Sequence, residues 1–110
     1  MTAPNPSRPG TSDALSAGQR RYLRGLCHAL HPVILLGAKG VTDTLTRELG
    51  IALDHHELVK IKLSGGDKTE RQQQLDALLE ATGAQVVQQI GHTASVFRRN
   101  PDEPKLALPR

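Results

Sequence analysis

A short glycine loop, Gly37-Ala38-Lys39-Gly40, joins an apolar, strand-like segment to a helix-like pattern. Glycines let another backbone approach closely, and a helix N-terminus presents free N–H groups and the positive end of the helix dipole. A phosphate group is the natural ligand of such a loop. Glycines at both ends of a tight turn also occur for purely steric reasons, so the pattern alone leaves both interpretations open.

The spacing of the glycines narrows the class of phosphate ligand. A mononucleotide P-loop needs GxxxxGK[ST], and a dinucleotide site needs a third glycine at GxGxxG spacing; this loop fits neither motif. GxxG between structured elements is the loop with which KH domains clamp a nucleic-acid backbone. Lys39 at the loop tip favours the same ligand. The loop therefore predicts contact with nucleic-acid phosphates.

Basic side chains elsewhere would extend this contact. Arg20 and Arg24 are four residues apart, which places them on one face of a helix. Lys60 and Lys62 flank the apolar Ile61 in an alternating strand, and Arg98 and Arg99 are adjacent in the last predicted strand. The two arginines of that pair lie on opposite faces, so at most one shares a face with the lysines. The predicted RNA-binding residues are Gly37, Ala38, Lys39, Gly40, Arg20, Arg24, His28, Lys60, Lys62, Arg98 and Arg99.

Three helices are expected to position these residues. Ser16 and Gln19 form a capping box that starts the first helix, and Pro32 is expected to end it at His31, so that His28 and His31 continue the basic face. A second apolar stripe runs from Val41 to Ala52 and ends near 54–56. The third helix starts at the Asp67 cap, and Gly83 follows its end.

Four strands complete the predicted fold. "VILLG" (33–37) is continuously apolar and is expected to be buried on both faces, whereas 57–64 alternates, with Val59, Ile61 and Leu63 on one face. Two further strands flank the "GHT" hairpin at 91–93. The order α-β-α-β-α-β-β predicts an α+β fold with a mixed four-stranded sheet. We expect residues 1–14 to be a disordered tail, 15–99 the domain, and 100–110 a second tail partly docked through Leu106 and Leu108.

Composition limits the class of protein. The 110 residues carry a net charge of +3 and a pI near 9.4, which suits a polyanionic partner, although solubility would also explain it. The single Cys27 excludes an internal disulfide framework and is expected to be a buried, inert thiol. No signal peptide or membrane span is apparent, so we expect a cytoplasmic monomer. Tyr22 and Phe97 are the only large aromatics, which argues against base stacking of the RRM kind.

Metal binding and catalysis find little support in the sequence. His55 and His56 are adjacent and cannot share a helix face, and neither Cys-x-x-Cys nor His-Glu-x-x-His occurs. We expect these two histidines to bond carbonyls at the end of the second helix. Asp54 and Glu57 are the nearest carboxylate pair, but they straddle that helix end without a nucleophile. We therefore expect no metal, no cofactor and no enzymatic activity.

Several stretches in order resemble one known family. "LRGLCHALHPVILLGAKGVT", "ALDHHELVKIKL", "TGAQVVQQIGHTASVFRR" and the closing "LALPR" are similar to the YhbY family of stand-alone bacterial CRM domains, over residues 15–110. The resemblance implies RNA binding, association with precursors of the large ribosomal subunit, and a fold similar to the C-terminal domain of translation initiation factor three. The family's GxxG motif corresponds to Gly37–Gly40.

Three functional hypotheses follow. The first is a non-catalytic RNA-binding domain that grips ribosomal RNA during subunit assembly through the loop and the basic surface. The second is an adaptor that docks on a ribosomal or other protein, with its basic surface serving solubility. The third is an enzyme acting on a small nucleotide, which the missing Walker loop disfavours.

Overall fold

Capping signals set the helices of this chain, and apolar alternation sets most of its sheet. The computed structural model describes residues 14–109, and within them the chain has three helices and four strands in the predicted order. The Ser16–Gln19 capping box is present, and Thr42 and Asp67 cap the other two helices. The elements are α2 (Ala17–Cys27), β1 (Ile34–Leu35), α3 (Asp43–His56), β2 (Leu58–Lys62), α4 (Lys68–Thr82), β3 (Gln85–Ile90) and β4 (Thr93–Phe97).

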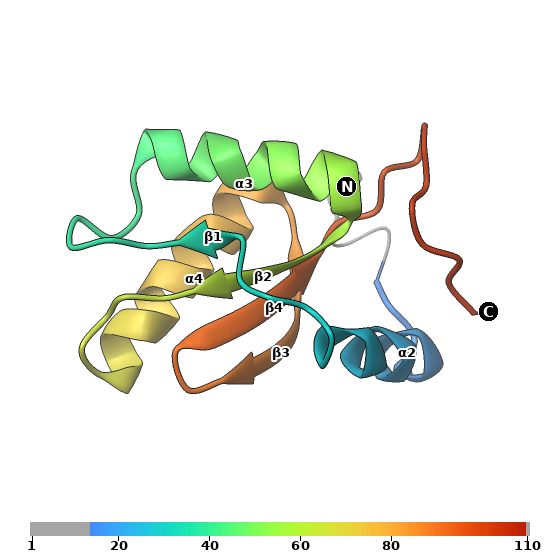
Figure 1. Ribbon diagram of the computed structural model, residues 1–110, viewed down its shortest axis with the longest axis horizontal. Coiled ribbons are helices and arrows are strands. Elements are labelled where there is room, and N and C mark those ends of the chain that lie inside the picture. Colours follow the sequence, from blue (N-terminus) through green and yellow to red (C-terminus); the bar gives the residue numbers. More distant parts are fainter. Residues whose placement is uncertain (1–13, 110) are drawn as a thin grey trace, which may run out of the picture.

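The sheet is mixed, as predicted, and its strand order is β1-β2-β4-β3 (Figure 1). β1 pairs parallel with β2 through the α3 crossover. β4 pairs antiparallel with both β2 and β3, so it lies between them. The second crossover, through α4, therefore yields two strands of the same direction that are not neighbours.

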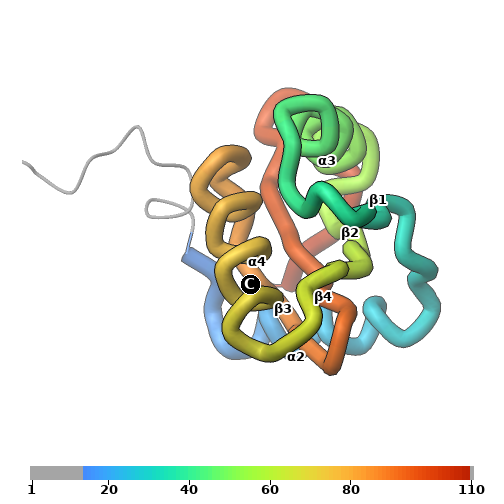
Figure 2. Tube along the Cα trace, turned by 90° about the vertical axis from the view of Figure 1, so that its left-hand side faces the viewer, coloured from blue at the N-terminus to red at the C-terminus, as the bar shows by residue number. Residues whose placement is uncertain are grey.

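The first face of the sheet is closed by two helices. Val59, Ile61 and Leu63 of the β2 segment all point toward this face and are nearly inaccessible, as their alternation predicted. α3 and α4 lie over them on the same side of the sheet (Figure 2). Their buried partners from the two helices are Leu49, Leu53, Leu75 and Leu78. At about 2 kcal/mol for each buried side chain, this cluster is the main source of stability.

The second face is only partly covered. Leu23 and Cys27 of α2 pack onto Leu58, Val87 and Phe97, which come from three different strands. Cys27 is a free, fully buried thiol, as predicted. α2 covers one end of this face, and the end that includes β1 carries no helix (Figure 1).

Two sequence predictions in this region are wrong. α2 ends at Cys27 rather than at His31, because the chain tightens there: Ala29 and Leu30 donate to the carbonyls of Leu26 and Cys27. His28 and His31 therefore do not continue a helical face.

The second error concerns the "VILLG" strand, which is not buried on both faces. β1 is a two-residue edge strand (Ile34–Leu35), and burial alternates through it and its two neighbours. Ile34 and Leu36 are buried, whereas Val33 and Leu35 are 58% and 61% exposed. An edge strand without a helix over its second face leaves every other side chain open to solvent.

Residues 98–109 form a strap that closes the covered end of the second face. Leu106 and Leu108 pack against the α2 cluster, as expected of a partly docked tail, and Gln19 Nε2 donates to the carbonyl of Pro109 at 3.0 Å. The segment contains no helix or strand. The predicted N-terminal tail lies, apart from residue 14, outside the described residues.

A buried carboxylate fixes the strap. Glu57, which is 0% exposed, accepts hydrogen bonds from the backbone N–H groups of Asn100 (2.6 Å), Lys105 (2.8 Å) and Leu106 (2.9 Å) and from Arg99 Nη1 (3.3 Å). Its backbone has a φ of 63°, in a region that favours glycine. The hydrogen bonds of the carboxylate therefore compensate for a backbone conformation that would otherwise favour glycine at this position.

Glu57→Gln tests the contribution of this carboxylate. The amide keeps the volume but removes the charge and turns an NH₂ group toward donors, so we expect the free energy of unfolding to fall by about 3 kcal/mol. Urea denaturation measures it. The matched control is Glu103→Gln, the same change at a side chain that is 78% exposed, which should leave the midpoint nearly unchanged. Equal midpoints for the two variants would contradict the assigned role.

Candidate nucleic-acid interface

The glycine loop is a tight turn at one end of the sheet. Gly40 N–H donates to the carbonyl of Gly37 at 3.0 Å, and the two residues form an isolated antiparallel bridge. Ala38 and Lys39 occupy the tip, and both are exposed. The turn projects beyond the end of β1 and leads into α3 (Figure 1). Backbone and lysine are thus presented outward from the fold.

Glycine occurs at the two ends of the turn for different structural reasons. Gly40 has a φ of 69°, and a Cβ there would lie 3.2 Å from Gln74 Nε2, so the turn itself requires glycine. Gly37 has no left-handed φ, and a Cβ there would meet no atom within 4 Å. The steric interpretation therefore explains Gly40 but not Gly37, whose missing side chain leaves open space beside the exposed turn.

A second loop lies at the same end of the sheet. Leu36 N–H donates to the carbonyl of Lys62, which sets the GxxG turn beside the end of β2. The loop after β2 is held by Gln74, whose Oε1 accepts from the N–H groups of Ser64 and Gly65. Lys62 is exposed, and within residues 14–109 neither its ammonium nor that of Lys39 has an ion pair or hydrogen bond.

Sequence reasoning missed two cations at this end. Lys68 begins α4 directly after the second loop, and Arg71 Nη1 donates to the carbonyl of Gly65 at 3.3 Å and lies 3.4 Å from His92 Nε2. From the sequence alone, the "GGDKTER" segment (65–71) indicates only the helix cap at Asp67. Its position after a strand parallel to β1 was the signal that could have placed both residues beside the GxxG turn.

The predicted basic residues of α2 are separate from the loop. Arg20 Nη1 donates to the carbonyl of Val86 at 2.6 Å and so ties α2 to β3. Arg24 is half-buried and His28 is exposed, and among the described residues neither side chain has a partner. α2 lies at the far side of the molecule from the turn in Figure 1.

Lys60 lies between the end of the sheet that carries Lys62 and the end of α2. It shares the second sheet face with Lys62, as alternation predicted, because the two lysines pair with Ser95 and Thr93 of β4. Lys60 Nζ donates to the carbonyl of Cys27 at 3.0 Å, at the end of α2. The ammonium retains further N–H groups that this bond does not use.

The terminal arginines belong to the scaffold. Arg98 donates to the carbonyls of Thr82 (2.8 Å) and Gly50 (3.0 Å) and pairs with Asp54 (2.8 Å), so it ties β4 to both α3 and α4. Arg99 donates to the carbonyl of Leu106 within the strap and to the carboxylate of Glu57 at the α3–β2 junction. The prediction that the two arginines lie on opposite faces of the last strand is wrong, because β4 ends at Phe97 and both residues follow it. Both guanidinium groups have internal partners.

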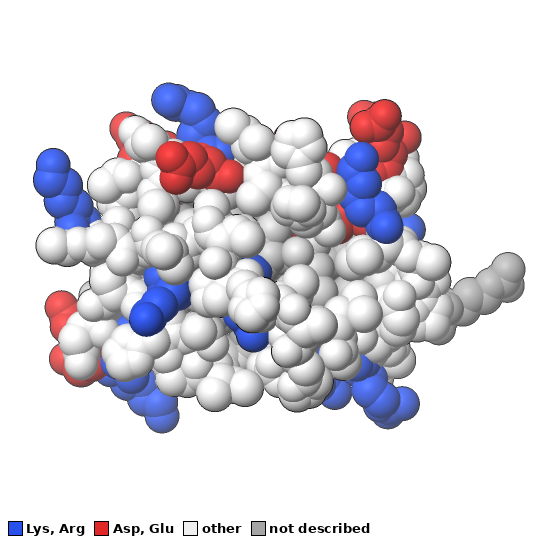
Figure 3. Space-filling view, in the orientation of Figure 1, with Lys and Arg blue, Asp and Glu red and all other residues white. Residues whose placement is uncertain are grey.

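Charged side chains are unevenly distributed over the surface. In the orientation of Figure 1, Figure 3 shows Lys and Arg side chains in the middle of the view as well as at its edges, whereas the visible Asp and Glu side chains lie toward the edges. His55 and His56 are exposed at the end of α3 with ring centroids 6.3 Å apart, and the predicted bonds to carbonyls are absent among residues 14–109. That part of the chain also contains no group of three metal-ligating side chains, and none of its helices is long and apolar enough to cross a membrane.

Comparison with known proteins identifies relatives over nearly the whole chain. The family model of the CRS1 / YhbY (CRM) domain matches residues 15–98. A Haemophilus influenzae protein named as RNA-binding is 42% identical over 96 residues, covering 87% of this chain and 96% of the relative. A candidate RNA-binding protein of Pseudomonas aeruginosa is 36% identical over 88 residues, covering 80% and 85% of the two chains.

A solved structure shares the fold. The solution structure of a hypothetical Staphylococcus aureus protein, a candidate RNA-binding protein, matches with a TM-score of 0.73 and 27% identity, over 86% of this chain and 99% of that one. The order of helices and strands, the sheet and the sequence similarity agree: this chain belongs to the CRS1/YhbY (CRM) domain family.

Proposed function

We propose that this protein binds RNA without catalysing a reaction on it, and that the GxxG turn grips the RNA backbone. The observation that carries the proposal is the open space at Gly37 beside an exposed lysine, at a position where the fold itself does not require glycine. Backbone N–H groups and a nearby ammonium are the groups that bind phosphate. Relatives named as RNA-binding proteins support the choice of ligand.

The contact surface would extend from the turn across the end of the sheet. Lys39 and Lys62 are free cations on it, and Lys68 and Arg71 lie beside the second loop. Arg24, His28 and Lys60 would form a second contact on and beside α2, at a distance from the turn. The internal bonds of Arg20, Arg98 and Arg99 give these three arginines a smaller part in the proposed footprint, as supports for the elements that carry it.

The biological target in this proposal is ribosomal RNA in precursors of the large subunit. Tyr22 and Phe97 are the large aromatics of the sequence and Phe97 is buried, so residues 14–109 offer no Phe, Tyr or Trp stacking platform of the RRM kind. Contacts to phosphates and 2′-hydroxyls recognise the shape of structured RNA. Such binding suits a factor that holds immature ribosomal RNA during assembly.

Gly37→Asp tests the turn directly. A carboxylate at Gly37 would stand where the phosphate is proposed to lie, and since the added Cβ meets no atom, the fold should be unaffected. We expect the affinity for structured ribosomal RNA to fall about tenfold or more by filter binding, the equivalent of one lost phosphate contact. The control is Gly18→Asp, the same change at an equally open position of α2. If the two variants bind alike, the turn does not grip RNA and an adaptor role gains support.

The salt dependence tests how many cations contact phosphate. If about four to six phosphates are neutralised, log K should fall with log salt at a slope of roughly −3 to −5. Lys39→Ala should reduce the magnitude of the slope by about 1, whereas Lys105→Ala on the strap should leave it unchanged. A wild-type slope near zero would contradict the electrostatic part of the proposal.

The assembly role is tested in cells. In sucrose gradients, the tagged protein should sediment with large-subunit precursors and be depleted from mature subunits, and Gly37→Asp should shift it to the top of the gradient. Sedimentation with the small subunit, or none with ribosomal particles, would contradict the proposed target while leaving RNA binding intact.

A further inference from the structure

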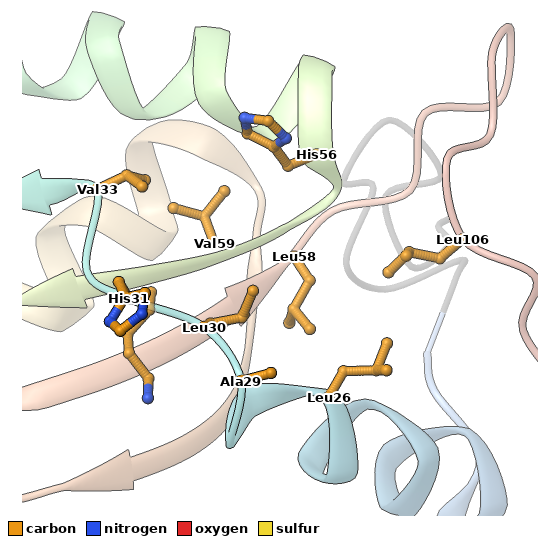
Figure 4. A pocket seen from close by; sticks show the side chains of 10 residues that line it. Leu26, Ala29, Leu30, His31, Val33, His56, Leu58, Val59 and Leu106 are labelled. Carbon is orange, nitrogen blue, oxygen red and sulfur yellow. The ribbon is translucent and has the colours of Figure 1, made fainter.

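An apolar pocket of about 560 Å³ opens at the start of β2, with a lining that includes Leu58 from the second face of the sheet and Val59 from the first (Figure 4). No residue of the GxxG turn lines it. It lies between the end of α2, the segment leading to β1, the start of β2, the end of α3 and the strap. Its apolar walls are formed by Leu26, Leu30, Val33, Leu58 and Leu106. A pocket of this size is in the range that binds small molecules or single groups of larger ones.

The pocket is held open by features already described. Val33 lies directly before the edge strand β1, where its backbone N–H donates to the carbonyl of Lys60 at 3.0 Å, and its side chain is 58% exposed. Leu106 is fixed by its backbone N–H, which donates to the Glu57 carboxylate at 2.9 Å. Backbone hydrogen bonds thus position the residues that carry two of the pocket's apolar side chains.

Two imidazole rings and one ammonium group also line the pocket. His56 at the end of α3 and His31 before β1 approach from different sides (Figure 4), and Lys60 comes from β2. Imidazole rings offer flat faces for stacking and polar nitrogens for hydrogen bonds. Lys60 Nζ spends one N–H on the carbonyl of Cys27 and keeps others. No Asp or Glu is among the residues that line the pocket.

We propose that this pocket receives one unpaired base of the RNA bound at the GxxG turn, an inference that rests on the proposed function. A base has apolar faces, polar edges and an anionic backbone, which matches apolar walls, two imidazoles and an ammonium. An apolar peptide side chain would use the walls but not the imidazole and ammonium groups. Val33 of the pocket and Gly37 of the turn are joined by β1, about 13 Å apart for four extended residues, so one RNA strand can reach both.

The test compares two RNA hairpins that are identical except for one bulged nucleotide. Wild-type protein should bind the bulged hairpin about tenfold more tightly than the fully paired one, the value of one stacked base. Ala29→Leu adds volume at an exposed residue that lines the pocket; it should abolish this preference while leaving the affinity for the paired hairpin unchanged. The control is Ala107→Leu, the same change on the strap outside the pocket lining, which should keep the preference.

A second variant guards against misfolding of the first. The His56 side chain is exposed and, within the described residues, makes only a ring contact with His55, so His56→Ala should fold normally and reduce the preference about threefold. Equal wild-type affinities for the two hairpins, or an undiminished preference in both pocket variants, would overturn the base pocket while leaving RNA binding at the turn intact. Failure of wild-type protein to bind either hairpin would overturn the proposed function, and the pocket with it; the pocket would then suit an apolar segment of a protein partner.

Discussion

The carboxylate of Glu57 gathers more hydrogen bonds between the α3–β2 junction and the strap than the side chain of Asn100, whose Nδ2 adds a single bond to the carbonyl of Asp54. It sits between α3 and β2, which follow each other without a loop, and it receives three backbone N–H groups and a guanidinium from the strap. Burial of an ionised carboxylate is costly unless its oxygens are hydrogen-bonded, so the strap must be in place for the side chain to be stable there. Closing the strap also supplies Leu106 and Leu108 to the second cluster. The stability of the α3–β2 junction is therefore coupled to the coverage of the second face by the strap.

The unequal covering of the sheet leaves the molecule with one closed face and one partly open face. One face is closed by α3 and α4 and supplies most of the buried apolar surface. The other is covered at one end by α2 and the strap, which leaves β1 and the ends of β2 and β4 open. The GxxG turn and the pocket both arise at this incomplete covering, one at the tip of β1 and one at its base. Because the larger buried cluster lies on the first face, the fold tolerates exposed lysines and apolar side chains on the second.

Local signals predicted the parts of the fold that depend on neighbours in sequence. The Ser16 and Asp67 caps, the burial of Val59, Ile61 and Leu63, and the hairpin at Gly91 are encoded within a few residues. The errors arose where distant segments decide. An apolar run at 33–37 says nothing about whether a helix covers its second face, and Pro32 marks only the latest residue at which α2 could end. The role of Glu57 depends on residues 42 or more positions away in the sequence. Treating Glu57 as a candidate carboxylate pair with Asp54 therefore did not predict that role.

The same limit applies to the candidate site. A basic residue in a sequence reads as available charge, but Arg20, Arg98 and Arg99 donate to backbone carbonyls of other elements and so serve the scaffold. Guanidinium groups suit this work because their planar fork can reach several acceptors at once. The lysines at the end of the sheet are different, because the ammonium groups of Lys39 and Lys62 have no acceptor among the described residues. The division is not complete, because Lys60 also donates to a backbone carbonyl, that of Cys27, and Arg24 has no partner among the described residues. The net charge of +3 therefore understates how strongly one end of the molecule can attract phosphate.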